Sequence, residues 1–312
     1  MPVKHLLSIS DVDRETIQSL VETAVAIAEG RWAAERPLAG RIVGIYFRKS
    51  STRTRTSFTV AALKLGAQVI TYGPNDLQIV TGESVPDTAR VLANYLDALV
   101  IRTNETMAEM RELASQDRMA VVNAMSASEH PTQSLADLAT LREHFGRLAG
   151  LHVLYLGEGN NSASAISLAV SRLPGMRLTL VTPEGYGLPA DFMAEVRATA
   201  EANGSEVEQH HDMSRLPRGV DAVYTTRWLT MGVKRADEGW IPKFRPYTVT
   251  PAVMAEVSKP DGSTVFLHDL PAMRGYEVLD EVLDGPQSIA FRQAYHKMTS
   301  AMAVLDWCLA GG

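Results

Sequence analysis

The side chains best suited to chemistry form a run of hydroxyl and guanidinium groups from Ser50 to Ser57. Before it, the apolar segment 42–47 predicts a buried strand, and after it apolar residues recur at helical spacing. The run therefore lies at a helix N-terminus, where free backbone N–H groups and the helix dipole favour an anion. Arg53 and Arg55 add charge-assisted hydrogen bonds, so the expected ligand is a compact dianion such as phosphate. A capped surface helix with two solvated arginines is the alternative interpretation.

Two further polar residues follow predicted strands in the same half of the chain. Arg102 ends the predicted strand 98–101, and His130 stands before Pro131 in the loop after 120–122. A residue before proline is held on extended backbone, which suits a fixed hydrogen-bond donor. A histidine that caps a helix is the alternative interpretation.

Composition is typical of an ordinary globular protein. The chain has 312 residues, of which 46% are hydrophobic, and a formal net charge of -6. This acidic balance disfavours nucleic acid and anionic membranes as main partners. The single cysteine, Cys308, cannot form an internal disulfide and suits a reducing compartment such as the cytoplasm. We expect no secretory signal, no membrane-spanning stretch and no internal repeat.

Strand and helix patterns alternate along the chain, which predicts an α/β fold with two doubly wound parallel-sheet domains. The predicted strands are 42–47, 68–72, 98–101, 120–122, 152–156, 178–181, 221–224 and 264–267. The pattern pauses near 146–150, so we expect one domain of residues 1–146 and a second of 147–287. A C-terminal helix of about 288–312 is expected to pack back on the first domain. Loops that converge at strand ends predict a cleft between the domains.

Two motifs of the second half resemble sites that we reject. Gly157 and Gly159 resemble the start of a dinucleotide-binding turn, but Ser162 stands where the third glycine is required. A dehydrogenase is therefore excluded. His210 and His211 could ligate a metal, but a solvated face is the better interpretation of their polar surroundings. We expect no metal and no cofactor.

Four short strings together resemble the aspartate/ornithine carbamoyltransferase family. They are Ser51–Arg55, His130–Gln133, Thr230–Gly232 and His268–Pro271. The residues after the last string, and the segment 83–90, are similar to the ornithine branch. The resemblance implies an enzyme that transfers the carbamoyl group of carbamoyl phosphate to an amine. It also implies a homotrimer with shared active sites.

The resemblance assigns carbamoyl phosphate to the first domain. The residues implied as its ligands are Ser51, Thr52, Arg53, Thr54, Gln78, Arg102, His130, Gln133 and Lys297. Arg102 and His130 would polarise the carbonyl oxygen, and Gln78 would reach the site of a neighbouring subunit. Carbamoyl transfer needs donors on the developing oxyanion and cations on the leaving phosphate, and this set contains both.

The resemblance assigns the amine acceptor to the second domain. The implied acceptor-binding residues are Asn160, Asn161, Thr226, Arg227, Thr230, Met231, His268, Asp269 and Leu270. The implied catalytic residues are Arg53, Arg102, His130 and Asp269. Backbone carbonyls of His268–Pro271 would face the attacking amine.

Four positions depart from the ornithine branch. That branch has a cysteine where Asp269 stands, an aspartate where Thr226 stands, a serine where Thr230 stands and an arginine where Lys297 stands. The aspartate branch fits no better, although Thr226 and Arg227 resemble its Thr-Arg pair.

These departures predict an acceptor other than ordinary ornithine or aspartate. The missing carboxylate at Thr226 and the added cation at Arg227 favour an acceptor with an additional anion, or one without a free α-amino group there. Asp269 would hold the attacking amine or help to deprotonate it. A shorter diamino acid such as 2,3-diaminopropionate, or an amine of specialised metabolism, fits. The alternatives are ornithine carbamoyltransferase itself and a non-catalytic relative that binds phosphate-like ligands.

Overall fold

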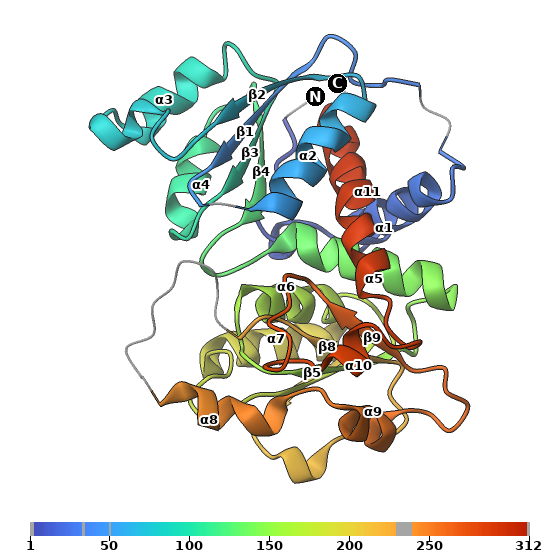
Figure 1. Ribbon diagram of the computed structural model, residues 1–312. Helices are drawn as coiled ribbons and strands as arrows, with labels where there is room; N and C mark the ends of the chain where they lie inside the picture. Colours follow the sequence, from blue (N-terminus) through green and yellow to red (C-terminus); the bar gives the residue numbers. More distant parts are fainter. Residues whose placement is uncertain (1–2, 33–34, 50, 229–238, 311–312) are drawn as a thin grey trace. The chain divides into compact units, whose positions relative to one another are not determined.

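The computed structural model describes residues 3–32, 35–49, 51–228 and 239–310 of the chain. It divides into two compact units, one of Met1–Ala139 with Tyr295–Gly312 and the other of Thr140–Ala294. Each unit is built around one sheet in which every strand pair is parallel, which confirms the predicted α/β architecture (Figure 1). The expected boundaries at 146 and 287 stay predictions.

The first unit contains a sheet of strand order β2-β1-β3-β4. The strands are β1 (Ile42–Phe47), β2 (Gln68–Tyr72), β3 (Ala98–Arg102) and β4 (Ala120–Met125). The chain passes from β1 to β2 on one side and then returns to β3 on the other, so the order reverses between β1 and β3. Parallel sheets bind ligands at the carboxyl ends of the strands beside such a reversal. The run after β1 and Arg102 at the end of β3 both lie at this point.

Helices cover both faces of this sheet. Figure 1 shows α3 (Val85–Leu92) and α4 (Met107–Leu113) on one face, and α1 (Arg14–Ala28) and α2 (Thr52–Lys64) on the other. Short 3-10 turns occur at η1 (Ile9–Asp11) and η2 (Gln78–Thr81). The long helices α5 (Pro131–Phe145) and α11 (Ala290–Leu309) each contribute most of their length to this unit. The C-terminal helix therefore belongs with the first sheet.

Side chains on one face of the first sheet form a core with α3 and α4. Leu99 and Ile101 of β3 pack there with Leu92 and Met110, and all four are buried. Successive strand residues point to opposite faces, so the residues between them face α1 and α2. Gly44 lies opposite Leu99 in the register, and a Cβ at Gly44 would meet Leu96 Cδ1 at 2.6 Å. A side chain at Gly44 would therefore displace Leu96, which follows α3.

The second unit contains a sheet of strand order β7-β6-β5-β8-β9. The strands are β5 (His152–Leu156), β6 (Arg177–Val181), β7 (Glu206–His210), β8 (Ala222–Thr225) and β9 (Val265–His268). Its helices are α6 (Asn161–Val170), α7 (Ala190–Asn203), α8 (Trp240–Phe244), α9 (Pro251–Val257) and α10 (Asp280–Leu283), with 3-10 turns η3 (Met213–Arg215) and η4 (Arg245–Tyr247). The strand order reverses between β5 and β8, so this unit has its own ligand position there.

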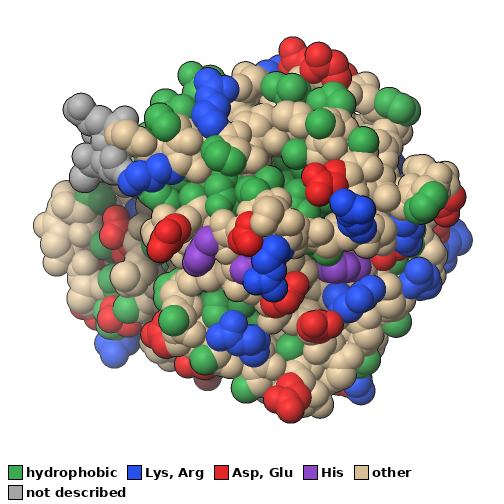
Figure 2. Space-filling view, turned by 90° about the horizontal axis from the view of Figure 1, so that it is seen from below, with side chains coloured by type: hydrophobic (Ala, Val, Ile, Leu, Met, Phe, Trp, Pro, Cys, Tyr) green, Lys and Arg blue, Asp and Glu red, His purple; other side chains and the backbone are tan. Residues whose placement is uncertain are grey.

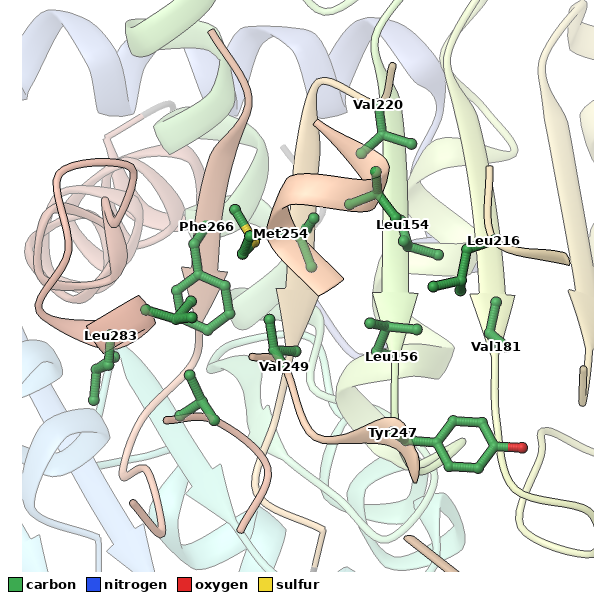
Figure 3. Close-up of a cluster of buried hydrophobic side chains, with 14 of the residues drawn as sticks. Leu154, Leu156, Val181, Leu216, Val220, Tyr247, Val249, Met254, Phe266 and Leu283 are labelled. Atoms are coloured by element: carbon green, nitrogen blue, oxygen red, sulfur yellow. The ribbon is translucent and has the colours of Figure 1, made fainter. Parts of the chain in front are cut away.

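One row of side chains crosses the second sheet in register. Leu154 of β5 pairs with Val223 of β8, which pairs with Phe266 of β9. These residues pack with Met254 of α9 and Leu283 of α10 in a buried cluster (Figure 3). Burial of one such side chain stabilises a fold by about 1.5–3 kcal/mol. The cluster holds the strand ends that carry the acceptor-side residues.

The surface carries charged side chains of both signs. Acidic and basic side chains are interspersed on the face drawn in Figure 2. Within the described ranges, no helix is both long enough and apolar enough to cross a membrane. Burial raises the pKa of the Cys308 thiol to about 12, so this thiol is protonated and unreactive at neutral pH.

Candidate active site

The polar run after β1 forms the N-terminus of α2. Ser51 is the N-cap residue, and its hydroxyl accepts a hydrogen bond from the Thr54 backbone N–H at 3.4 Å. Thr52 is exposed and Arg53 is half-buried, whereas Thr54 is buried. The first turn of α2 carries no acidic side chain, so nothing in it opposes the positive end of the helix dipole. The predicted anion site therefore has the local geometry that it needs.

Arg102 connects this turn to the end of β3. Its Nη1 donates to Thr54 Oγ1 at 3.3 Å, and the arginine is 7% exposed. The register of β3 with β4 shifts between Ile101 and Arg102, where Arg102 pairs with Met125. The extra residue, Ala124, lies in β4, whereas Arg102 stays in regular register with Phe47 of β1. Arg102 is the last residue of β3, and its bond to Thr54 places the guanidinium at the α2 N-terminus.

His130 lies at the start of α5, immediately before Pro131 at the first helical position. The imidazole is buried, and its backbone carbonyl accepts from the Gln133 N–H at 2.9 Å. Burial, followed by the positive charges of Lys297 and Arg102, holds the pKa of His130 well below its ordinary value of 6.5. The ring is therefore neutral at physiological pH and can donate one N–H to a ligand oxygen. His130 Nδ1 also lies 3.5 Å from Thr132 Oγ1 in the first turn of α5. Its roles as a ligand-binding or a capping residue stay predictions.

Gln133 and Lys297 are joined in the same unit. Lys297 Nζ of α11 donates to Gln133 Oε1, and Gln133 Nε2 donates to Asp137 Oδ1 at 2.8 Å. All three residues are almost completely buried. Two side chains far apart in sequence and expected at the carbamoyl phosphate site are therefore in direct contact. The same glutamine also bonds an aspartate that the sequence analysis did not single out.

Gln78 hydrogen-bonds within its own turn. It is exposed in η2, and its Oε1 accepts from Thr81 Oγ1 at 2.7 Å. Arg55 stacks its guanidinium over the Phe47 ring at 5.4 Å, and no described residue accepts a hydrogen bond from its buried Nε. Arg55 therefore supports the turn through a cation–π contact with the end of β1.

In the second unit, the turn after β5 requires glycine at two positions. Gly157 has φ +126°, which side chains rarely adopt, and a Cβ at Gly159 would lie 2.3 Å from the Leu188 backbone N. The turn leads directly to Asn160, the N-cap of α6. The glycines therefore bring the α6 N-terminus close to the strand ends, without a dinucleotide fingerprint.

The side chains of Asn160 and Thr226 hydrogen-bond to one another. Asn160 Oδ1 accepts from the backbone N–H groups of Ser162 and Ala163 at 3.0 and 3.2 Å, and its Nδ2 donates to Thr226 Oγ1 at 2.9 Å. Tyr155 Oη donates to the Glu158 carbonyl at 2.8 Å, so the 2.9 Å contact between Tyr155 Oη and Thr226 Oγ1 uses the threonine proton. Thr226 is 1% exposed. Its hydroxyl ties β8 to the α6 cap by donating one hydrogen bond and accepting another.

The segment after β9 is held by a buried pair of ionisable groups. His268 Nδ1 accepts from the Leu270 backbone N–H at 2.8 Å, so its Nε2 carries the proton that points to Glu277 Oε1 at 3.3 Å. Both side chains are completely buried, and Glu277 Oε1 also accepts from the Met273 N–H. Leu270 has φ +49°, an unfavourable conformation for a leucine that these bonds stabilise.

Asp269 is the partly exposed acidic side chain at this strand end. Its Oδ2 accepts from Ser162 Oγ of α6 at 2.9 Å, and its side chain is 17% exposed. Arg227 is half-buried after β8, and no described residue accepts a hydrogen bond from its buried Nε. A carboxylate and a guanidinium therefore stand near the β5–β8 reversal of this unit, where an amino acid could be recognised by charge. Asn161, also predicted, is buried in the first turn of α6.

Two predicted acceptor residues, Thr230 and Met231, lie outside the described residues. No group of three or more His, Cys, Asp or Glu side chains that could hold a metal is present in the described part of the chain. His210 is half-buried at the end of β7, and His211 Nδ1 contacts the Thr182 carbonyl at 2.8 Å. His211 therefore has a structural partner in the neighbouring strand segment.

Three residues that support the site escaped the sequence analysis. Asp137 and Glu277 orient Gln133 and His268, and Ser162 holds Asp269. For Asp137 a signal existed, because it stands four positions after Gln133 on one helix. Glu277 stands nine positions after His268 in irregular chain, and Ser162 is distant in sequence from Asp269, so neither pair has a local pattern.

Comparisons with known proteins find one family along the chain. Residues 4–143 match the family described as aspartate/ornithine carbamoyltransferase, carbamoyl-P binding domain. Residues 149–308 match the Asp/Orn binding domain of the same family. The matches therefore cover nearly the whole chain.

Individual relatives are similar over their full length. The ornithine carbamoyltransferase of Gloeobacter violaceus is 38% identical over 306 residues, which cover 98% of this chain and 96% of that protein. The protein of the same name from Methanobrevibacter smithii is 37% identical, with 97% and 98% covered. The solved ornithine carbamoyltransferase from Pyrococcus furiosus aligns with a TM-score of 0.91 at 35% identity, and covers 100% of this chain and 98% of that chain.

Proposed function

Because the chain belongs to the aspartate/ornithine carbamoyltransferase family and is a carbamoyltransferase, we propose that it carbamoylates the side-chain amine of ornithine. The full-length relatives that are named ornithine carbamoyltransferase support this acceptor. The sequence alone favoured a different acceptor and kept ornithine as the alternative, so the comparisons support the alternative better.

One observation carries the proposal: Arg102, a neutral His130 and the α2 N-terminus gather at the β1–β3 reversal of the first unit. The α2 N-terminus with Ser51 to Thr54 would hold the phosphate. Arg102 and His130 would donate to the carbamoyl oxygen, which becomes an oxyanion during the reaction. A neutral His130 suits this role, because it donates a hydrogen bond and adds no positive charge beside Arg102 and Lys297.

In the proposed reaction the neutral amine attacks the carbonyl carbon of carbamoyl phosphate. A C–N bond forms, the bond from carbon to the bridging phosphate oxygen breaks, and the electron pair leaves with phosphate. The ammonium form of the acceptor first gives up one proton to solvent. After the attack, the nitrogen passes a second proton to a phosphate oxygen as the intermediate collapses. Asp269, held by Ser162, is the carboxylate proposed to bind the amine. No cofactor is required by this chemistry.

A second candidate acceptor is favoured by Thr226 and Arg227. The buried hydroxyl of Thr226 offers no carboxylate to an α-ammonium group, and the Arg227 guanidinium has no described counter-charge. Charge complementarity at these residues favours an acceptor with an additional anion, or a shorter diamino acid such as 2,3-diaminopropionate.

Product analysis separates the two acceptors. The purified protein is incubated with carbamoyl phosphate and ornithine, aspartate or 2,3-diaminopropionate, and ureido products and phosphate are quantified. A kcat/KM for ornithine well above those of the others supports the first acceptor. A preference for another amine supports the second. Phosphate binding without any ureido product would instead support a non-catalytic relative.

We also propose that the chain assembles as a homotrimer. Four large apolar side chains of the first unit are each more than 40% exposed. They are Leu63 of α2, Ile70 of β2, Val91 of α3 and Tyr95 just after α3. These elements surround the unpaired edge of β2, and a partner subunit would cover such apolar side chains. The exposed Gln78 of η2 would then be placed to reach a neighbour's site. Sedimentation equilibrium tests this: a mass three times that of the chain is expected.

A further inference from the structure

A buried line of charged and polar side chains runs from α11 to α5 within the first unit. It consists of Lys297, Gln133 and Asp137, which are 7%, 1% and 0% exposed. Lys297 Nζ bonds to Gln133 Oε1, and Gln133 Nε2 bonds to Asp137 Oδ1 at 2.8 Å. Asp137 stands one helical turn behind Gln133 on α5, away from the cap where His130 lies.

The two charged ends determine how the amide of Gln133 is oriented. A carboxylate only accepts hydrogen bonds, so the –NH₂ group of Gln133 must face Asp137. An ammonium only donates, so the carbonyl oxygen must face Lys297. The amide cannot rotate by half a turn without breaking both charge-assisted bonds. Its second N–H and its second lone pair therefore have fixed directions.

Asp137 also changes the electrostatics of the cluster. The surrounding groups Arg102 and Lys297 are cationic, and both lower the pKa of His130. Removal of a buried carboxylate makes such a site more positive, which strengthens binding of a bare dianion by Coulomb attraction. Loss of Asp137 would therefore weaken the binding of a ligand that the oriented Gln133 amide recognises. The same loss would strengthen the binding of a bare dianion, because a negative charge is removed.

We propose that Asp137 is a positioning residue that orients Gln133 to recognise the carbamoyl group, as distinct from the phosphate. This inference rests on the proposed function, since it assigns the amide of Gln133 to the carbamoyl end of the substrate. Asp137 does not touch the substrate in this account. It acts through Gln133, and Lys297 binds the carbonyl oxygen of the same amide.

The test compares two stable probes by calorimetry. Inorganic phosphate carries no amide, whereas phosphonoacetamide carries a phosphonate and a carbamoyl-like amide. In Asp137→Asn the charge-assisted bond becomes neutral, and the preference for phosphonoacetamide over phosphate is expected to fall about tenfold. The Kd of phosphate itself is expected to stay unchanged or to decrease. The KM of carbamoyl phosphate is expected to rise more than kcat falls.

A double-mutant cycle separates positioning from general damage. Gln133→Ala removes the amide, so adding Asp137→Asn to it is expected to change the probe preference no further. Asp221→Asn is the matched control, because Asp221 is a buried aspartate that bonds a lysine, Lys259, in the second unit. That control is expected to lower stability and to leave the preference unchanged.

Two results would overturn the inference. One is an equal loss of phosphate and phosphonoacetamide binding in Asp137→Asn, and the other is a further loss of preference when Asp137→Asn is added to Gln133→Ala. Failure of the proposed function is a different result: the wild type would then form no ureido product and bind phosphonoacetamide no better than phosphate.

Discussion

Thr226 Oγ1 accepts a hydrogen bond from Asn160 Nδ2 at 2.9 Å and donates one to Tyr155 Oη at 2.9 Å. This single hydroxyl connects the end of β8 to the cap of α6, across the reversal in strand order of the second unit. A position expected to bind the acceptor therefore also holds the acceptor-side framework together.

Thr226→Val tests the structural part of this role. Valine keeps the shape and removes the hydroxyl, so the buried Asn160 amide and the Tyr155 hydroxyl each lose a partner. The free energy of unfolding is expected to fall by about 1–3 kcal/mol, measured in urea. Thr199→Val, at a half-buried threonine of α7, serves as the control. Equal stability of the two variants would show that the connection contributes nothing.

Glu277→Gln tests whether the His268–Glu277 pair holds the acceptor segment. The variant replaces a charge-assisted bond to His268 Nε2 by a neutral one, which loosens the Leu270 peptide bonded to the other ring nitrogen. The KM of the acceptor is expected to rise about tenfold, with the affinity for carbamoyl phosphate unchanged. Asp284→Asn, at an exposed partner of Arg274, is expected to change neither constant. Loss of carbamoyl phosphate affinity in Glu277→Gln would contradict the assignment.

The lowered pKa of His130 predicts a pH dependence of stability. An unfolded chain binds a proton at His130 below about pH 6.5, whereas the folded chain does not, so stability decreases as pH falls through this value. The slope from one such group approaches about 1.4 kcal/mol per pH unit. His130→Gln should lose this slope, as measured by denaturant unfolding from pH 7.5 to pH 5.5. Identical slopes in both proteins would show that His130 is not held neutral.

Lys297→Met tests the cation that α11 contributes. Loss of this positive charge removes the second cause of the shift, so the pKa of His130 should rise toward 6.5, as followed by NMR of the imidazole. The KM of carbamoyl phosphate should increase at least about tenfold, because a buried charge-assisted donor is lost. An unchanged histidine titration would place Lys297 too far from His130 to matter.

Much of the fold followed from sequence patterns, and the failures have physical causes. Buried strands such as β3 (Ala98–Arg102) are continuous apolar runs, which is the pattern of a central parallel strand. The strand β7 (Glu206–His210) escaped prediction because it is an edge strand with one buried residue, Val207, between glutamates. Charged side chains protect an edge strand and hide its pattern.

Site residues were predictable where a local sequence pattern indicates a ligand site. A hydroxyl-rich helix start after a strand indicates an anion site, and Ser51 and Thr54 lie at such a helix start. Two hydrogen bonds join residues that are far apart in sequence. One runs from Arg102 to Thr54, and the other from Ser162 to Asp269. Such contacts arise only when the strand order brings their elements together. The functional roles of the predicted residues stay predictions until the variants are measured.

The most direct test of the account is the turnover of carbamoyl phosphate with ornithine by the wild type and by Arg102→Met. The wild type is expected to form one ureido product per phosphate released. Loss of one donor to the oxyanion should slow Arg102→Met by about a hundredfold to a thousandfold. Absence of a ureido product with ornithine and with every other amine tested, while carbamoyl phosphate still binds, would contradict carbamoyl transfer as the function of this chain.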